Sequence, residues 1–244
     1  MRILGYSERG LVNSLFFEIA YSQNSELLLY ELLSISRFPF LSNYKFSVSD
    51  AVILVEQSFS DFGDADSLLL ITSEDKSSSV FIEAKVKPFQ KKSWSIEDEF
   101  DNFINGTKSK VSSSNLFTQL YHKVRLVTSL RQSGMISIQK GIPFPSSSSK
   151  QIRKIGNNQI VLNATKALLE HLDDTLYLAI VPDDRNNLET FYKSGLLEVE
   201  PEGYLDWDVS PYGYTTWADV ESYCRRNQLE NTLSVFEHNQ GQIY

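Results

Sequence analysis

The sequence contains a single cysteine, Cys224, among its 244 residues. One thiol can form neither a disulfide within the chain nor a cysteine-based metal cluster, and we therefore expect a protein of the reducing cytoplasm. Long hydrophobic runs are also absent, because no apolar stretch approaches the roughly 18 residues that suggest a membrane span. The opening residues lack the apolar segment of a secretion signal. These absences predict a soluble protein that is not exported and has no membrane partner.

Several common catalytic motifs are missing as well. The three histidines, His122, His171 and His238, are scattered and show no HExxH or similar zinc-binding spacing. No glycine-rich phosphate loop follows a predicted strand, and no GxSxG nucleophile elbow is present. Candidate catalytic residues must therefore be sought among other residue types.

Acidic residues are absent from the 68 residues between Asn102 and Leu169, although the chain contains 31 of them and has a net charge of −8. A partner meets only one part of a protein surface, and so the net negative charge does not exclude nucleic acid. This acid-free segment predicts a phosphate-facing surface, and the alternative is a basic face that is merely solvated. The residues that we expect to contact phosphates are Lys108, Lys110, Lys123, Arg125, Arg153 and Lys154.

A hydrophobic content of 41% is enough to build the core of one α/β domain of this length. Apolar residues recur with helical spacing from Ser7 to Tyr21, and a second helical stretch runs from about Ser25 to Ser36. Three short runs rich in apolar and β-branched residues follow, and the turn-prone segments between them predict an antiparallel meander. The three runs are Ala51 to Gln57, Ser67 to Thr72 and Val80 to Val86.

The second half of the chain alternates helical patterns with one apolar strand. The run TLYLAIV, residues 175–181, is continuously apolar, which is typical of a strand covered on both faces. We expect a mixed central sheet flanked by helices. Residues 1–185 would form the core, and residues 186–244 would form a helical, aromatic extension packed on the same domain. Helices are expected near residues 96–105, 115–131, 159–172, 188–194 and 217–227, with aromatic-rich loops between the last two.

Three polar residues interrupt the predicted meander at defined positions. Asp66 immediately precedes one apolar strand, while Glu83 and Lys85 lie within the next. Side chains of a strand alternate between faces, and so Glu83 and Lys85 project on the same side. A hairpin can bring Asp66 beside Glu83, and two adjacent carboxylates repel unless a proton or a cation lies between them. Hard oxygen ligands suit Mg²⁺ or Mn²⁺, and a neighbouring lysine can stabilise charge on a phosphate or position the attacking water.

This arrangement resembles the PD-(D/E)XK nuclease superfamily, whose signature is an Asp at the start of one strand and Glu-x-Lys within the next. Here these residues are Asp66 and Glu83-Ala84-Lys85, with Ala65 in place of the proline and Asp64 as an alternative ligand. The order helix, three-stranded meander, helix, strand is similar to the αβββαβ, restriction-endonuclease-like core of that superfamily. The resemblance implies that Asp66 and Glu83 bind the metal, that Lys85 assists the water or the phosphate, and that the reaction is phosphodiester hydrolysis.

Two further catalytic residues are implied by the same resemblance. Members often supply a Glu from the first helix, where this sequence has Glu8 and Glu18. At about 100° per residue Glu8 falls near the centre of the apolar stripe and Glu18 at its edge, and so Glu8 is the expected additional metal ligand. The alternative is that Glu8 only complements the helix dipole. Many members also place a Gln on the helix after the Glu-x-Lys strand, which predicts Gln119; the alternative is a surface glutamine.

Three hypotheses of function follow. The first is a nuclease that depends on Mg²⁺ or Mn²⁺ and acts on DNA, in defence against foreign DNA or in repair, with a homodimer favoured if both strands are cut. The second is a binding or assembly module that keeps the nuclease fold without catalysis. The third is an unrelated α/β protein in which Glu83 and Lys85 form an ion pair. An aromatic cluster, Trp207, Tyr212, Tyr214 and Trp217, suits either base stacking or a core.

Overall fold

The computed structural model describes residues 3–41, 44–74, 76–88, 93–105, 114–144, 152–198, 204–205 and 207–243. Lys108 and Lys110, two of the predicted phosphate contacts, lie outside these ranges. Among the described residues, no helix combines the length and the apolar character that crossing a bilayer requires.

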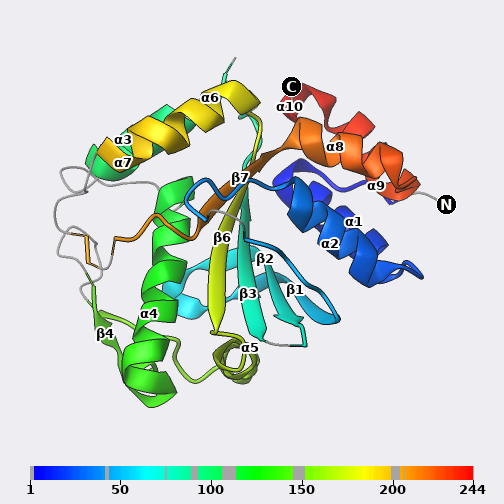
Figure 1. Ribbon diagram of the computed structural model, residues 1–244. Helices are drawn as coiled ribbons and strands as arrows, with labels where there is room; N and C mark the ends of the chain where they lie inside the picture. The colour runs from blue at the N-terminus through cyan, green and yellow to red at the C-terminus, as the bar shows by residue number, and fades with distance from the viewer. Residues whose placement is uncertain are drawn as a thin grey trace.

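The centre of the molecule is a mixed sheet with the strand order β1-β2-β3-β6-β7 (Figure 1). The first three strands form an antiparallel meander, as predicted, while β6 and β7 each run parallel to the preceding neighbour in the sheet. The strands are β1 (Asp50–Ser58), β2 (Asp64–Thr72), β3 (Ser77–Ala84), β6 (Asp174–Val181) and β7 (Tyr212–Thr216). The α/β class and the mixed central sheet flanked by helices are thereby confirmed.

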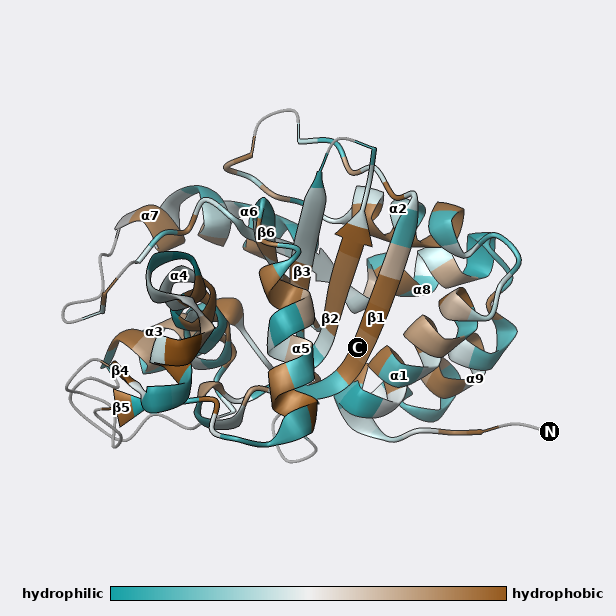
Figure 2. Ribbon diagram, turned by 90° about the horizontal axis from the view of Figure 1, so that it is seen from below, coloured by the Kyte–Doolittle hydropathy of each residue, from teal (hydrophilic) through white to brown (hydrophobic). Residues whose placement is uncertain are grey.

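Helices cover both faces of this sheet (Figures 1 and 2). One face carries α1 (Ser7–Ala20), α2 (Ser25–Ile35), α8 (Trp217–Arg226) and α9 (Glu230–His238). The opposite face carries α3 (Ile96–Asn105), α4 (Leu116–Lys140) and α5 (Gln159–Leu169). The remaining elements are short: a 3₁₀ turn (Ser60–Phe62), the pair β4 (Ile142–Pro143) and β5 (Ile152–Arg153), α6 (Arg185–Thr190), a π-helical turn (Phe191–Gly195), α7 (Leu196–Glu198) and α10 (Gln240–Ile243).

Alternation along β3 divides the buried residues between two cores. Val80, Ile82 and Ala84 contribute to the core under α1 and α8, whereas Phe81 contributes to the core under α4. Because side chains alternate in a strand, Glu83 shares the face of Phe81 and points toward α4. The sheet therefore places this carboxylate inside the molecule.

The segment after residue 185 is more closely integrated than its aromatic composition suggests. Residues 212–216, expected to be part of a loop, form β7 and complete the sheet beside β6. Helix α9, which was not predicted, packs against α1. The expected helix over residues 188–194 is instead divided between α6 and the π-helical turn. Helix α4 also extends beyond its predicted end, to Lys140, across a non-helical residue at Gly134.

Candidate functional site

The candidate site lies where β2 begins and β3 ends. The last backbone pair between these strands is Ser67 with Ile82, and so Asp66 and Glu83 are the next residues along the two strands. Beyond the last backbone pair, the Asp66 side chain links the two strands, because its Oδ2 accepts a hydrogen bond from the backbone N–H of Ala84 at 2.8 Å. Asp66 is therefore fixed beside the residue that separates Glu83 from Lys85. The alternative ligand, Asp64, has an exposed side chain.

Glu83 is 0% exposed, and neither of its carboxylate oxygens accepts a hydrogen bond from the described part of the chain. Its nearest cation is Lys123 of α4, whose Nζ lies 3.4 Å from Glu83 Oε1. The Lys123 side chain is also fully buried. Its Nζ donates to the carbonyl oxygens of Phe62 at 3.1 Å and Asp64 at 2.9 Å. One ammonium thus links β3 to the segment that leads into β2.

The electrostatic balance of the site disfavours its negative charges. Burial raises the pKa of Glu83 to about 7, with Asp66 adding to the rise and Lys123 opposing it. Burial also raises the pKa of Asp66; Glu8 adds to this rise, while the Ala84 N–H, Lys85 and Lys123 oppose it. Protein cations alone therefore leave the two carboxyl groups incompletely stabilised in their charged form.

Lys85 follows the last residue of β3, and its backbone is held from two sides. Its N–H donates to the carbonyl oxygen of Ile180 on β6 at 2.9 Å, and Trp217 Nε1 donates to its carbonyl oxygen at 2.7 Å. At the other end of the side chain, Lys85 Nζ donates to Gln119 Oε1 of α4. Gln119 is thus a contact of Lys85 rather than an isolated surface residue.

The two candidate glutamates of the first helix occupy different surroundings. Glu8, in the first turn of α1, is partly buried, accepts a hydrogen bond from Ser7 Oγ and lies within electrostatic reach of Asp66. Glu18 instead accepts backbone hydrogen bonds at the start of α9, from Asn231 at 3.1 Å and from Thr232 at 2.8 Å. Glu18 is therefore a capping residue of another helix.

The predicted phosphate contacts are divided between the interior and the surface. Lys123 is enclosed, and Arg125 is buried and donates to the carbonyl oxygen of Pro143 at 3.3 Å; neither is placed to contact a phosphate backbone on the surface, which corrects that expectation. Arg153 is partly buried, with its guanidinium 4.4 Å from the centre of the Phe144 ring and bonded to the Asp61 carbonyl oxygen. Lys154 is exposed.

The pattern of apolar residues along α4 predicts that the side chain of Lys123 is buried. Leu116, Leu120 and Val127 lie on one helical stripe, and Lys123 falls within it at the spacing i, i+4, i+7, i+11. A lysine inside an apolar stripe is expected to be buried with a partner. The acid-free composition of the surrounding segment points to surface charge and masks this periodicity.

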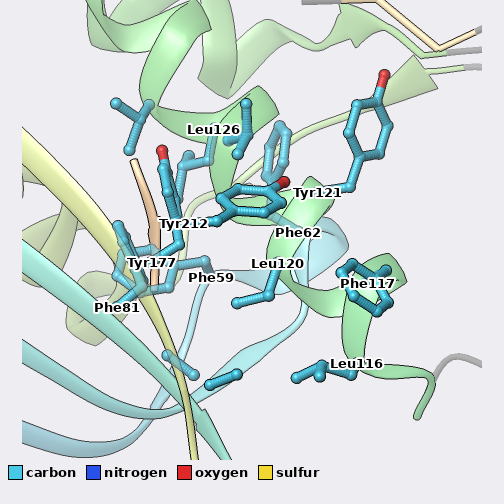
Figure 3. Close-up of a cluster of buried hydrophobic side chains, with 14 of the residues drawn as sticks. Phe59, Phe62, Phe81, Leu116, Phe117, Leu120, Tyr121, Leu126, Tyr177 and Tyr212 are labelled. Carbon is cyan, nitrogen blue, oxygen red and sulfur yellow. The ribbon is translucent and has the colours of Figure 1, made fainter. Parts of the chain in front are cut away.

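The aromatic cluster belongs to the core. Tyr212 and Tyr214 are buried in the core under α4, and Trp207 packs against that core, whereas Trp217 is buried in the core on the other face of the sheet. Figure 3 shows Tyr212 close to Tyr177 within the apolar layer beneath α4. Base stacking by these three buried rings would require them to leave the core, and the core alternative is therefore the one that the structure supports.

The oxygen ligands that the described residues offer at this site are too few to surround a metal ion completely, but they are of the type and number that Mg²⁺ commonly uses. Among the described residues, no group of three or more His, Cys, Asp or Glu side chains is arranged to hold a metal ion. Mg²⁺, however, commonly uses one or two carboxylates and completes its shell with waters and substrate phosphates. Asp66 together with the Glu83 oxygens that accept no hydrogen bond meets that smaller requirement.

The fold and these side chains define an α/β protein with paired carboxylates at the end of a buried strand. Comparison with protein-family models, with curated proteins and with solved structures finds no match to this chain.

Proposed function

We propose that the protein is a metal-dependent nuclease of the PD-(D/E)XK type, with DNA as its substrate. The order of elements supports this proposal, because α1 is followed by the antiparallel strands β1, β2 and β3, then by α4, and then by β6 parallel to β3. This is the order expected of a restriction-endonuclease-like αβββαβ core. Within it, Asp66 is the third residue of β2, Glu83 is the penultimate residue of β3, and Lys85 follows the last residue of β3.

Each site residue has a distinct role in this proposal. Asp66 and Glu83 hold Mg²⁺ or Mn²⁺, and Glu8 adds negative charge from α1. When bound, the ion would supply Lewis-acid stabilisation of the phosphate and lower the pKa of a water molecule. Lys85 orients the attacking water or neutralises charge that develops on the phosphate. Gln119 limits the positions open to the Lys85 ammonium by accepting its hydrogen bond.

The observation that carries the proposal is the burial of the Glu83 carboxylate without hydrogen bonds from the described part of the chain. Its side chain is 0% exposed, yet its oxygens accept no hydrogen bond within the described residues. Burying a carboxylate without hydrogen bonds is strongly unfavourable, and proteins seldom retain such a group without a cation to bind. Lys123 offsets only part of this cost, because the pKa of Glu83 stays raised, and a divalent ion held by Glu83 and Asp66 would offset more of it.

Cleavage of supercoiled and linear DNA tests the proposal directly. We expect the purified protein to nick or linearise DNA with Mg²⁺ or Mn²⁺ and to lose this activity in EDTA. Asp66→Asn serves as the matched control, because an asparagine oxygen can still accept the Ala84 hydrogen bond while the negative ligand is removed. Equal cleavage by the wild type and Asp66→Asn would assign the activity to a contaminant. No cleavage under any metal condition would favour the second candidate.

That second candidate is a nuclease-fold binding or assembly module without catalysis. The specific observation in its favour is Lys123, whose ammonium already lies 3.4 Å from Glu83 Oε1 and supplies a positive charge without any metal. The two candidates differ in one measurable property, since only the nuclease needs a divalent ion at the Asp66 and Glu83 pair. A module of this kind would bind its partner equally well in EDTA.

A further inference from the structure

The buried ammonium of Lys123 is surrounded by oxygen atoms. It donates to two carbonyl oxygens, of Phe62 and Asp64, and lies 3.4 Å from Glu83 Oε1. These three oxygens come from two different stretches of chain that meet at the site. A cation enclosed by a carboxylate and two carbonyl groups resembles in its ligands a bound metal ion more than a surface lysine.

Exposure separates Lys123 from the other lysine of the site. The side chains of Lys123 and Glu83 are both 0% exposed, so that water cannot screen the pair. Lys85 is partly buried, and its ammonium bonds to the neutral Gln119 instead of a carboxylate. Of these two lysines, Lys123 is therefore the one that directly neutralises Glu83.

We propose that Lys123 is a positioning residue that acts as the internal cation of the site, holding Glu83 in the metal-free protein and weakening the binding of a divalent ion there. The effect on metal rests on the proposed function, whereas the neutralisation of Glu83 does not. The ammonium competes in two ways: it engages Oε1, and its charge repels a divalent cation only a few ångströms away. For a double and a single positive charge about 5 Å apart, at an effective dielectric constant near 20, that repulsion amounts to roughly ten times the thermal energy.

A double-mutant cycle in EDTA tests the neutralisation. Lys123→Met, Glu83→Gln and the double variant are unfolded in denaturant beside the wild type. Measured well above pH 7, where Glu83 is ionised in the wild type, Lys123→Met should lower the folding equilibrium constant at least tenfold more in the wild-type background than beside Glu83→Gln. Only in the wild-type background does the substitution remove the cation that compensates a buried carboxylate. Equal losses in both backgrounds would mean that Lys123 only supports the Phe62 and Asp64 carbonyl groups, and would overturn the proposal.

Manganese titration tests the competition. Lys123→Met is expected to bind Mn²⁺ at least tenfold more tightly than the wild type, while Lys45→Met, at an exposed position, is expected to leave the affinity for Mn²⁺ unchanged. Unchanged or weaker binding by Lys123→Met would contradict the competition. If Lys123→Met does not fold in EDTA, either Mn²⁺ or the added Glu83→Gln substitution should restore folding, and failure of both would overturn the proposal.

The outcomes also separate this inference from the proposed function. Suppose that neither the wild type nor Lys123→Met binds Mn²⁺, while the EDTA cycle still shows the tenfold coupling. The nuclease hypothesis would then fail, and with it the effect on metal, but Lys123 would stand as the internal cation of Glu83. Tight Mn²⁺ binding without coupling in the EDTA cycle would support the metal site and overturn the role of Lys123 as the internal cation of Glu83.

Discussion

Glu83 is the residue on which the proposed chemistry depends most, and its titration is measurable. In the folded protein its pKa is raised to about 7, against 4.5 as the ordinary value expected after unfolding. Between these two pH values the folded state binds more protons than the unfolded state, and so stability falls as pH rises through this window. At about 1.4 kcal/mol per pKa unit, the loss is on the order of 3 kcal/mol.

Denaturant unfolding of the metal-free protein between pH 4.5 and pH 7.5 checks this prediction. The wild type should lose stability as pH rises, and Glu83→Gln should flatten most of the slope because its amide does not titrate. Glu26→Gln, at an exposed position in α2, is the matched control and should keep the wild-type slope. A slope in Glu83→Gln equal to that of the wild type would remove Glu83 as its cause.

Substitution of Lys85 should separate metal binding from catalysis. Lys85→Ala should lose metal-dependent cleavage while keeping its affinity for Mn²⁺ or gaining some, because the ammonium repels the cation beside which it works. Cleavage assays and calorimetry on the same preparation measure both properties. A structural ion pair between Glu83 and Lys85 would instead make Lys85→Ala unstable, with no selective effect on cleavage.

At the scale of the elements, α1 contains both candidate glutamates, Glu8 and Glu18, and the two have different contacts in the structure. Glu18 accepts hydrogen bonds from the first turn of α9, including the Thr232 backbone N–H at 2.8 Å. Glu18→Ala should therefore lower the free energy of unfolding by about 1 to 2 kcal/mol, as expected for loss of a helix cap. Glu26→Ala, at its exposed position, is the control. Chemical denaturation that showed equal effects for both would refute the capping role.

The elements that the sequence predicts well are those with a strong local pattern. The three strands of the meander and β6 lie within a few residues of their predicted bounds, because continuous or alternating apolar residues determine burial directly. Strand β7 escapes prediction since YGYTT, residues 212–216, is short and contains a glycine. Its strand character depends on pairing with β6, which no local window contains.

The site was predictable to a similar degree. The spacing of Asp66, Glu83 and Lys85 follows from strand alternation and one hairpin, and the structure brings these residues to adjoining strand ends. The participation of Lys123 depends on how α4 packs over β3, which is a tertiary feature. Its position in the apolar stripe of α4 would have predicted burial but could not have identified Glu83 as its partner.

At the scale of the whole molecule, the described part of the acid-free segment divides its basic residues between the interior and the surface. Lys123 and Arg125 are buried, whereas Lys140, Lys154 and Lys166 are exposed. If nucleic acid binds here, the exposed lysines make the phosphate contacts, and affinity must fall as salt rises through counterion release.

Lys154→Glu tests this surface with little risk to the fold. It should weaken DNA binding and reduce the magnitude of the salt dependence by roughly one released counterion, because one lysine no longer neutralises a phosphate. Arg226→Glu, an exposed charge reversal on α8 of the opposite layer, should have a smaller effect. Fluorescence anisotropy at several salt concentrations provides the measurement. Salt-independent binding, or equal effects from both variants, would remove the role of the segment.

The central claim is that Asp66 and Glu83 together hold a divalent ion, and calorimetric titration with Mn²⁺, paired with thermal melts, tests it most directly. We predict that the wild type binds Mn²⁺ at millimolar concentration or below and melts at a higher temperature with the ion. Asp66→Asn and Glu83→Gln should each remain folded but lose both effects. A wild-type protein that binds no divalent ion at millimolar concentration, and melts identically with and without it, would contradict the claim.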